Sequence, residues 1–390
     1  MPRFARRITR SSPKDYGMFA RALKYDTNPN APMIHLELGR PVDDTPAHIK
    51  QATIDALRAG HVHYSDLQGL PELRVALAQR LGEKNAMAVG PDQIIVTNGL
   101  TQASFATFMA LLDEGDEAIL LAPYYPQHIG KIEMAGATPV IAPLDAASGF
   151  RIRRDLIEPH VTKRTRMIVL VNPCNPTGRV YSREELQELA DLAIAYDLTV
   201  VTDEVYESIV FDRAQHISIA SLPGMAERTV TMQAFTKAYA MDGWRIGFLV
   251  APADYIPALL KITTTEVTHV NTFIQYGALA AVQGPAEVLA GMVAGDRARR
   301  DLVVSRLNQM PGVTCAMPEG TIYAFPDISG TGLKAQDAAE RIMTETGVVV
   351  EAGSFYGSQG EKHLRICFGA QSAEVLEVAM DRLQAFFNDL

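Results

Sequence analysis

The sequence has few cysteines, and it contains no long apolar run. Its three cysteines, Cys174, Cys315 and Cys367, are far apart and match neither a zinc site nor a disulfide framework, which favours a reducing, cytoplasmic compartment. No segment approaches the roughly 20 consecutive apolar residues that a membrane-spanning helix needs, so we expect no membrane partner. Basic residues are also in the minority, 36 against 45 acidic ones, which argues against nucleic acid as a partner.

The basic residues that gather near the N-terminus do not form a targeting signal. Arg3, Arg6, Arg7 and Arg10 are followed by no apolar segment, so a signal peptide is not indicated. We expect a solvated N-terminal arm. The chain has 390 residues, more than one hydrophobic core usually supports, and two domains are therefore expected.

Short β-branched runs alternate with helical stretches from about residue 92 onward. Strands are expected at 93–99, 117–123, 137–143, 165–173, 198–206 and 228–237, with helices at 102–113, 126–136 and 182–197 between them. The last of these helices opens with Ser182 and Glu185, the spacing of a capping box. Apolar strands separated by helices indicate an α/β fold with a mainly parallel sheet covered on both faces, a three-layer domain.

Polar side chains follow these strands at the points where they end. They fall at 98–101, 124–125, 172–175, 203–206 and 236–237. Ligands of open α/β sheets bind outside the carboxyl ends of the strands, so the polar ends predict one shared site.

The pattern changes after about residue 284. A long charged helix is expected at 286–310, followed by strand-like pieces at 312–320, 321–328, 347–353 and 363–369 and a closing helix. We expect residues 46–284 to form the large domain. Residues 285–390, joined by part of the N-terminal arm within 1–45, are expected to form a smaller α+β domain.

Lys237 is the first candidate for chemistry. A lysine at the end of an apolar strand is costly to keep charged, and a depressed pKa lets its amine attack an aldehyde and form an imine. Arg245, eight positions later, has the planar guanidinium that suits a phosphate dianion. Spacing alone leaves open that both are ordinary solvated residues.

Asp203 ends a strand that should be central, and a buried carboxylate needs a cationic or hydrogen-bonding partner. A protonated pyridine nitrogen is such a partner, although a helix cap is the alternative. Tyr206 follows three residues later, and Asn175 lies in the rigid turn "NPCNPTG". Cys174 in that turn is more easily explained as a small buried filler than as a nucleophile. Gly99, Leu100 and Thr101 begin a helix, where free backbone amides favour phosphate.

Six segments together carry a family resemblance. "HYSDLQGLPELR", "TNGLTQA", "NPCNPTG", "DEVY", "TKAYAMDGWRIG" and "HLRICFG" have the order and spacing found in class I and II aminotransferases, enzymes that depend on pyridoxal 5'-phosphate (PLP). The chain resembles these fold type I enzymes from about Leu36 to its C-terminus, and most closely the bacterial aspartate and aromatic amino-acid aminotransferases.

The resemblance implies a role for each candidate residue. Lys237, preceded by Thr236, would hold PLP as a Schiff base and move the substrate proton, Asp203 would pair with the pyridine nitrogen, and Tyr125 would stack on the ring. Further residues would contact the cofactor or the substrate: Asn175 and Tyr206 at the ring oxygen; Gly99, Leu100, Thr101 and Arg245 at the phosphate; Tyr64 at the partner subunit's phosphate in a homodimer; Gly39 and Arg365 at the substrate α-carboxylate. Arg365 alone is also compatible with a surface salt bridge.

Several positions depart from the family pattern. Arg40 stands where an acidic residue is common, and it either meets an acidic substrate or pairs with Asp43 or Asp44. His128 occupies a frequent tyrosine position, and His269 falls where partner-subunit contacts usually lie. These departures concern the choice of substrate, and no metal site is indicated.

Three functions are compatible with these residues. The first is amino-group transfer from an α-amino acid to a 2-oxo acid. The second keeps PLP but breaks another bond, as a lyase, decarboxylase or oxidase does on the same fold. The third is a binding module without turnover, for which the chain offers no added basic domain.

Overall fold

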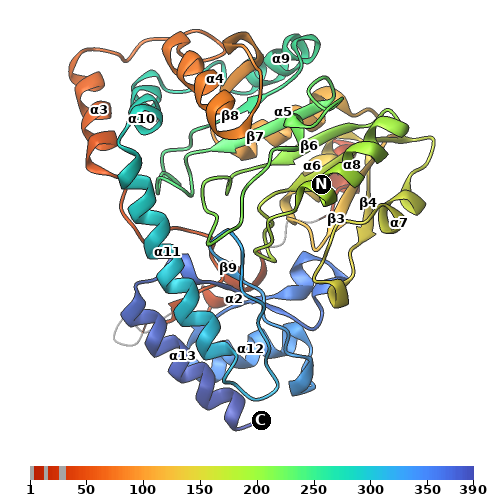
Figure 1. Ribbon diagram of the computed structural model, residues 1–390, viewed down its shortest axis with the longest axis vertical. Coiled ribbons are helices and arrows are strands. Elements are labelled where there is room, and N and C mark those ends of the chain that lie inside the picture. Colours follow the sequence, from red (N-terminus) through yellow and green to blue (C-terminus); the bar gives the residue numbers. More distant parts are fainter. Residues whose placement is uncertain (1–3, 13–15, 26–31) are drawn as a thin grey trace.

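The computed structural model describes residues 4–12, 16–25 and 32–390 (Figure 1). Within the basic N-terminal stretch, helix α1 (Arg6–Arg10) has no buried residue, and Arg3 lies outside the described residues. The arm nevertheless contacts the rest of the protein, since an Arg10 guanidinium nitrogen lies 2.7 Å from a Glu114 carboxylate oxygen.

A seven-stranded sheet forms the centre of the protein, with the order β2-β8-β7-β6-β5-β3-β4. Only β8 runs antiparallel to its neighbours, so the expected mainly parallel sheet is confirmed. The strands are β2 (Ile94–Thr97), β3 (Glu117–Ala122), β4 (Thr138–Pro143), β5 (Thr165–Val171), β6 (Thr199–Asp203), β7 (Thr229–Ala234) and β8 (Gly247–Val250). The short strand β8 is absent from the sequence prediction.

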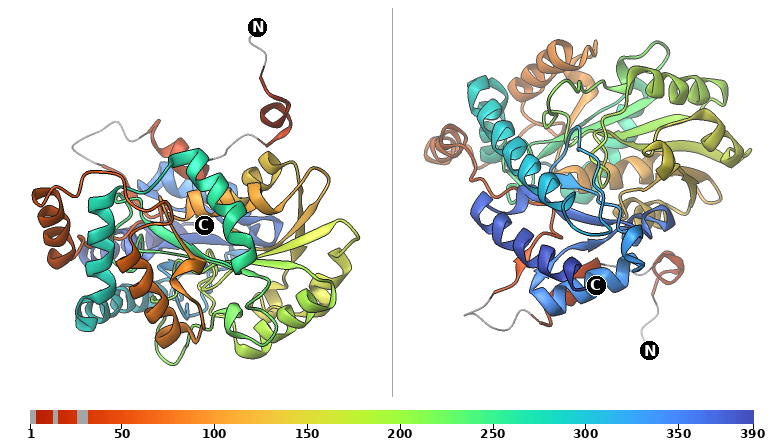
Figure 2. Two further views of the ribbon diagram at one scale, coloured as in Figure 1. Left: turned by 90° about the horizontal axis from the view of Figure 1, so that it is seen from above. Right: turned by 60° about the horizontal axis from the view of Figure 1, so that its bottom comes forward.

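Alternate residues of the strands enter two separate cores, which is why both faces of the sheet are covered. Ile119 and Leu121 pack on one face with α7 (Arg154–Ile157) and α8 (Arg183–Ala195). Ala118 and Leu120 pack on the other face with α5 (Leu100–Leu111), α6 (Gln127–Ala135) and α9 (Ile256–Val267). Figure 2 shows these helices on both sides of the strands, which confirms the three-layer architecture.

The predicted capping box at the start of α8 is present. The Ser182 hydroxyl accepts a hydrogen bond from the Glu185 amide, and the Glu185 carboxylate accepts one from the Ser182 amide. Beyond the β2 edge of the sheet, three further helices pack together, namely α3 (Ala47–Arg58), α4 (Pro71–Asn85) and α10 (Thr272–Gln283).

A second group of elements combines the two ends of the chain. Helix α11 (Ala286–Leu307) leads into it, and its other elements are α12 (Ala335–Thr346), α13 (Ala373–Asn388), β9 (Tyr323–Ala324), β10 (Val348–Val349), β11 (Glu351–Ala352) and β12 (Leu364–Cys367). From the N-terminal side, β1 (Ile34–His35) pairs with β10 and α2 (Gly17–Ala22) packs on β11. These elements form the lower half of Figure 1.

The strand expected at 312–320 does not form. Thr314 makes one isolated bridge with Asp327, and the following residues are irregular. Pro318 has no amide hydrogen to donate to a ladder, and Gly312 has a φ of +72°, so the segment does not continue as a strand.

In the described part of the chain, no single helix is long and apolar enough to cross a membrane. Helices α10 and α11 reach the required length and composition only when taken together, and they meet at an 85° bend.

A buried polar network supports the end of central strand β6. Glu204, directly after the strand, is fully buried and lies 3.1 Å from Nε2 of His216. The Ser218 hydroxyl donates to the same carboxylate over 2.8 Å. Burial lowers the pKa of His216, but the charge and hydrogen bond of Glu204 outweigh it and raise that pKa above its usual value.

The His216–Glu204 pair therefore predicts a pH-dependent stability. Because folding raises the pKa of His216, the pair's contribution is complete below the unfolded value of about 6.5 and is lost as the pH rises through the folded value. We expect His216→Asn to lower the free energy of unfolding by about 3 kcal/mol at pH 6 and by less at pH 8.5. Urea denaturation at both pH values measures this. The control Asp197→Asn removes an exposed ion pair with Arg228 and should change stability by less than about 1 kcal/mol. An equal loss from His216→Asn at both pH values would contradict the assignment.

Candidate active site

A cavity of about 340 Å³ lies at the carboxyl ends of the sheet strands. Its wall combines most of the residues that the sequence singled out. They are Gly39, Leu100, Thr101, Tyr125, Asn175, Asp203, Tyr206, Thr236, Lys237, Arg245 and Arg365. The polar strand ends thus meet at one place, together with β12 and the segment after β1.

Lys237 projects into this cavity from the loop after β7, and its ammonium donates to the carbonyl oxygen of Gly39. Burial lowers the pKa of this ammonium, and the nearby guanidinium groups of Arg365 and Arg245 act in the same direction against Cys367 and Asp242. A lowered pKa increases the fraction of unprotonated amine, which is the form that attacks a carbonyl group.

Asp203 is buried at the end of β6, beside His128. One carboxylate oxygen accepts from the Val205 amide, and the other lies 3.7 Å from His128 Nε2. Burial lowers the pKa of His128, with Lys131 acting in the same direction, so the imidazole is neutral near pH 7. Asp203 therefore faces the cavity as a buried carboxylate that forms no ion pair with a lysine or arginine among the described residues. The alternative helix cap is not its main role, since no helix begins there.

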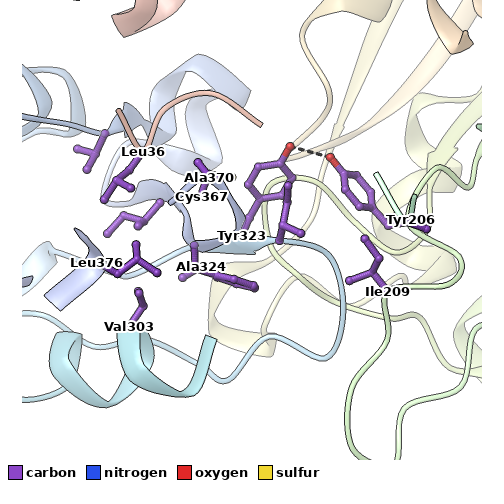
Figure 3. Packing of buried hydrophobic residues seen from close by; sticks show 14 of the residues in the cluster. Leu36, Tyr206, Ile209, Val303, Tyr323, Ala324, Cys367, Ala370 and Leu376 are labelled. Atoms are coloured by element: carbon purple, nitrogen blue, oxygen red, sulfur yellow. Dashed lines mark hydrogen bonds between the residues drawn. The ribbon is translucent and has the colours of Figure 1, made fainter. Parts of the chain in front are cut away.

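Tyr206 links the sheet to the second group of elements. Its hydroxyl forms a 2.6 Å hydrogen bond with that of Tyr323 on β9, and both rings are buried, as Figure 3 shows. Burial raises the pKa of Tyr323 to about 12 and that of Tyr206 well above its usual value, so both phenols stay protonated. Tyr125 also lines the cavity and lies edge-on to His128, with 5.2 Å between ring centroids.

The N-terminus of α5 and Arg245 form the cationic end of the cavity. Leu100 and Thr101 line the cavity, whereas Gly99 does not line it and lies next to the Arg245 guanidinium. Gly99 has a φ of +74°, and a Cβ added to it would lie 2.8 Å from Arg245 Nη2. The guanidinium can approach the helix start this closely because residue 99 has no side chain.

Arg365 is buried on β12, between two aromatic rings. Its guanidinium lies 4.4 Å from the ring centroid of Tyr323 and 5.1 Å from that of Tyr356. Nη1 donates to the Asn175 side chain over 3.3 Å, and Nη2 donates to the backbone carbonyl of Glu37. No carboxylate pairs with Arg365 among the described residues, and its Nε has no partner there. A surface salt bridge is therefore excluded for this residue.

Several other residues that the sequence singled out do not line the cavity. The Tyr64 side chain is 85% exposed and lies edge-on to His269, 4.9 Å between ring centroids. Arg40 is exposed, and its expected partners pair elsewhere, Asp43 with Arg299 and Asp44 with Lys50. The alternative pairing of Arg40 is thus wrong. Cys174 packs in the apolar core beside α8, as expected of a filler.

Several cavity residues are missing from the sequence prediction, among them three acidic or phenolic side chains. They are Tyr323, Glu37 and Glu351. Tyr323 stands in an ordinary apolar strand and gives no signal. The two glutamates do give one, since each interrupts an apolar run, in "IHLELG" and in "GVVVEAG". A charged residue in such a run is rarely without a function or a partner.

Comparison with known proteins identifies the family. The sequence pattern of the family "Aminotransferase class I and II" matches residues 31–383. Among curated relatives, an aspartate aminotransferase of Pyrococcus abyssi is 39% identical, covering 90% of this chain and 91% of the relative. An arginine–pyruvate transaminase of Pseudomonas aeruginosa is 38% identical, covering 85% and 84%. The solved aspartate aminotransferase of Thermus thermophilus with maleate superimposes with a TM-score of 0.92, at 33% identity over 99% of this chain and all of the other.

The chain belongs to the class I and II aminotransferases. It is a PLP-dependent transaminase, as the resemblance implied.

The cavity of this aminotransferase fits PLP. Lys237 offers an amine of lowered pKa, the α5 N-terminus with Arg245 offers an anion site, and Asp203 offers an unneutralised buried carboxylate. An aldehyde, a phosphate and a protonated pyridine are the matching groups of this cofactor. Among the described residues, no group of side chains has the composition of a metal site.

The close approach of Gly99 to Arg245 predicts a specific loss of PLP affinity. Gly99→Ala strains the backbone and places a methyl group against the guanidinium. We expect the dissociation constant of PLP to rise about tenfold, a loss of about 1.4 kcal/mol. Absorbance titration of the apoenzyme measures it. Gly130→Ala on α6, where an added Cβ meets open space, is the control and should bind PLP normally. Unchanged affinity in Gly99→Ala would show that Arg245 does not hold the phosphate.

Proposed function

We propose that this aminotransferase moves the amino group of an α-amino acid to a 2-oxo acid with PLP held by Lys237 as a Schiff base. The observation that supports the proposal is the lowered pKa of the Lys237 amine, in one cavity with Asp203 and with Arg365, whose guanidinium has no carboxylate partner among the described residues. When bound, PLP supplies a protonated ring that withdraws electrons from the substrate Cα.

Side chains at three ends of the cavity would hold the cofactor. Asp203 would keep the pyridine nitrogen protonated, with neutral His128 beside it. Leu100, Thr101 and Arg245 would bind the phosphate, and Tyr125 would cover the ring. Asn175 and Tyr206, together with Thr236 next to Lys237, would complete the contacts at the ring edge.

Arg365 would bind the substrate, and Lys237 would move its Cα proton. The Arg365 guanidinium, which has no carboxylate partner among the described residues, would bind the α-carboxylate in two-pronged fashion. That contact, with the Gly39 backbone beside it, would orient the Cα–H bond towards the Lys237 amine. The free amine of Lys237 would take the proton from the substrate Cα and deliver it to the carbon of the cofactor that receives the amino group.

Tyr64 extends the proposal beyond one chain. The exposed Tyr64 would reach the phosphate of a partner subunit, so we propose a homodimer with shared sites.

The three free, buried cysteines support a reducing, cytoplasmic location. We also propose domain boundaries near residues 45 and 284, since β1 and α2 pack with the elements that follow α11.

The half-reaction tests the transfer directly. Adding an amino donor to the PLP enzyme should convert its absorbance to that of the pyridoxamine form, and a 2-oxo acid should restore the original spectrum. Lys237→Ala should lower kcat at least about 10³-fold, because both the covalent link and the proton carrier are lost. Release of ammonia or CO2 without conversion of the cofactor would favour a lyase or decarboxylase instead.

Hybrid dimers test the role of Tyr64. Tyr64→Phe should weaken PLP binding about tenfold by removing a hydrogen bond to a charged group. Lys237→Ala should be inactive, yet a random mixture of the two should recover about a quarter of wild-type activity at limiting PLP, because one site of each hybrid is intact. Absence of recovery would place Tyr64 outside the partner's site.

A further inference from the structure

The substrate pocket contains two buried carboxylates that the proposed transfer does not use. Glu37 and Glu351 line the same cavity as Lys237 and Arg365, and each side chain is buried. They come from opposite parts of the chain, Glu37 from the segment after β1 and Glu351 from β11. Buried acids are rare without a partner, so this pair requires an explanation.

Glu37 is only partly satisfied within the protein. Its Oε1 lies 2.8 Å from His35 Nδ1, but its buried Oε2 has no hydrogen-bond partner among the described residues. The residue is 3% exposed. A buried acceptor left open in a cavity wall is a site for a donor that enters the cavity.

Glu351 is held in a fixed position on the same wall. Its carboxylate accepts hydrogen bonds from the Met18 amide at 3.1 Å and the Ala352 amide at 3.1 Å, and it forms no ion pair among the described residues. Burial raises its pKa to about 7, the charge of Arg365 lowers that pKa, and the charge of Glu37 raises it. A second cation in the cavity would favour the charged form of both acids.

The position of the acids relative to Arg365 indicates which part of a substrate they meet. Glu351 lies directly opposite Arg365 in the β11–β12 ladder, where opposite residues point to the same face. The backbone of Glu37 accepts from Arg365, and two residues later Gly39 accepts from Lys237. A substrate with its carboxylate on Arg365 and its Cα at Lys237 would share one cavity with both acids, and we infer that its side chain meets them.

We propose that Glu37 and Glu351 form a subsite for the positively charged end of an amino-acid side chain. This inference rests on the proposed transamination and gives its donor class: an α-amino acid with a cationic side chain. Phe19, Phe355 and Tyr356 line the cavity beside the acids, and their rings suit the stem and the charge of such a side chain. An acidic side chain would meet two carboxylates there and is disfavoured.

A pair of substrates that differ only in charge tests the subsite. L-arginine and L-citrulline have nearly the same shape, but only arginine is cationic. For the wild-type enzyme we expect kcat/KM to be at least about tenfold higher for L-arginine than for L-citrulline, and higher still relative to L-glutamate. Binding without turnover gives a second readout, in which 5-guanidinopentanoate should bind the PLP enzyme more tightly than hexanoate, as measured by calorimetry.

Charge-neutral variants assign the preference to the two acids. Glu37→Gln and Glu351→Gln keep an acceptor for His35 and Met18, and each should lower the arginine-to-citrulline ratio of kcat/KM about tenfold. Glu377→Gln, an exposed change on α13, is the matched control and should keep the wild-type ratio.

The possible outcomes separate the two proposals. Equal or faster turnover of L-citrulline or L-glutamate in the wild-type enzyme would overturn the cationic subsite and leave transamination standing. A wild-type preference for arginine that survives both glutamine variants would also overturn the role of these acids. Failure of every donor, charged or neutral, to convert the cofactor would instead refute the transamination itself.

Discussion

The constraint on which the active site depends is a buried carboxylate without a permanent cation. Asp203 ends the central strand β6, between β5 and β7, so the sheet fixes its position on both sides. Its neighbour His128 stays neutral because burial lowers the imidazole pKa. Directly behind it, Glu204 is satisfied by His216 and Ser218. The carboxylate of Glu204 is thus stabilised by the protein itself. The carboxylate of Asp203 faces the cavity, where a protonated pyridine is a suitable partner.

The second requirement is that chain segments from both ends meet over the sheet. The short run from Glu37 to Gly39 accepts hydrogen bonds from both Arg365 and Lys237, the two residues that we propose orient and deprotonate the substrate. The Tyr206–Tyr323 hydrogen bond joins the sheet to β9 close by. Since none of these contacts is local in sequence, the site exists only when the elements after α11 are packed against the sheet.

Charge divides the cavity into regions with different tasks. Arg245 and the start of α5 form a cationic end, and Arg365 provides a second cation that the protein leaves without a carboxylate partner among its described residues. Glu37 and Glu351 make the neighbouring wall acidic. The relatives in this family carry names that differ in their amino acid, aspartate in one and arginine in another. The proposed acidic subsite would account for such a difference, because the wall beside the cofactor site would meet the side chain of the substrate.

The sequence by itself determined the fold class and the cofactor chemistry. Alternating apolar strands and helices indicate a parallel sheet, and the polar residues after the strands meet at one edge since parallel strands all end there. Lys237, Asp203 and Arg365 could be found in this way because each stands in a local motif. Tyr323, Glu37 and Glu351 could not be placed, and neither could the true partner of Asp43. Their roles depend on packing between segments hundreds of residues apart, which local patterns do not encode, so only the tertiary structure decided the acidic character of the substrate wall.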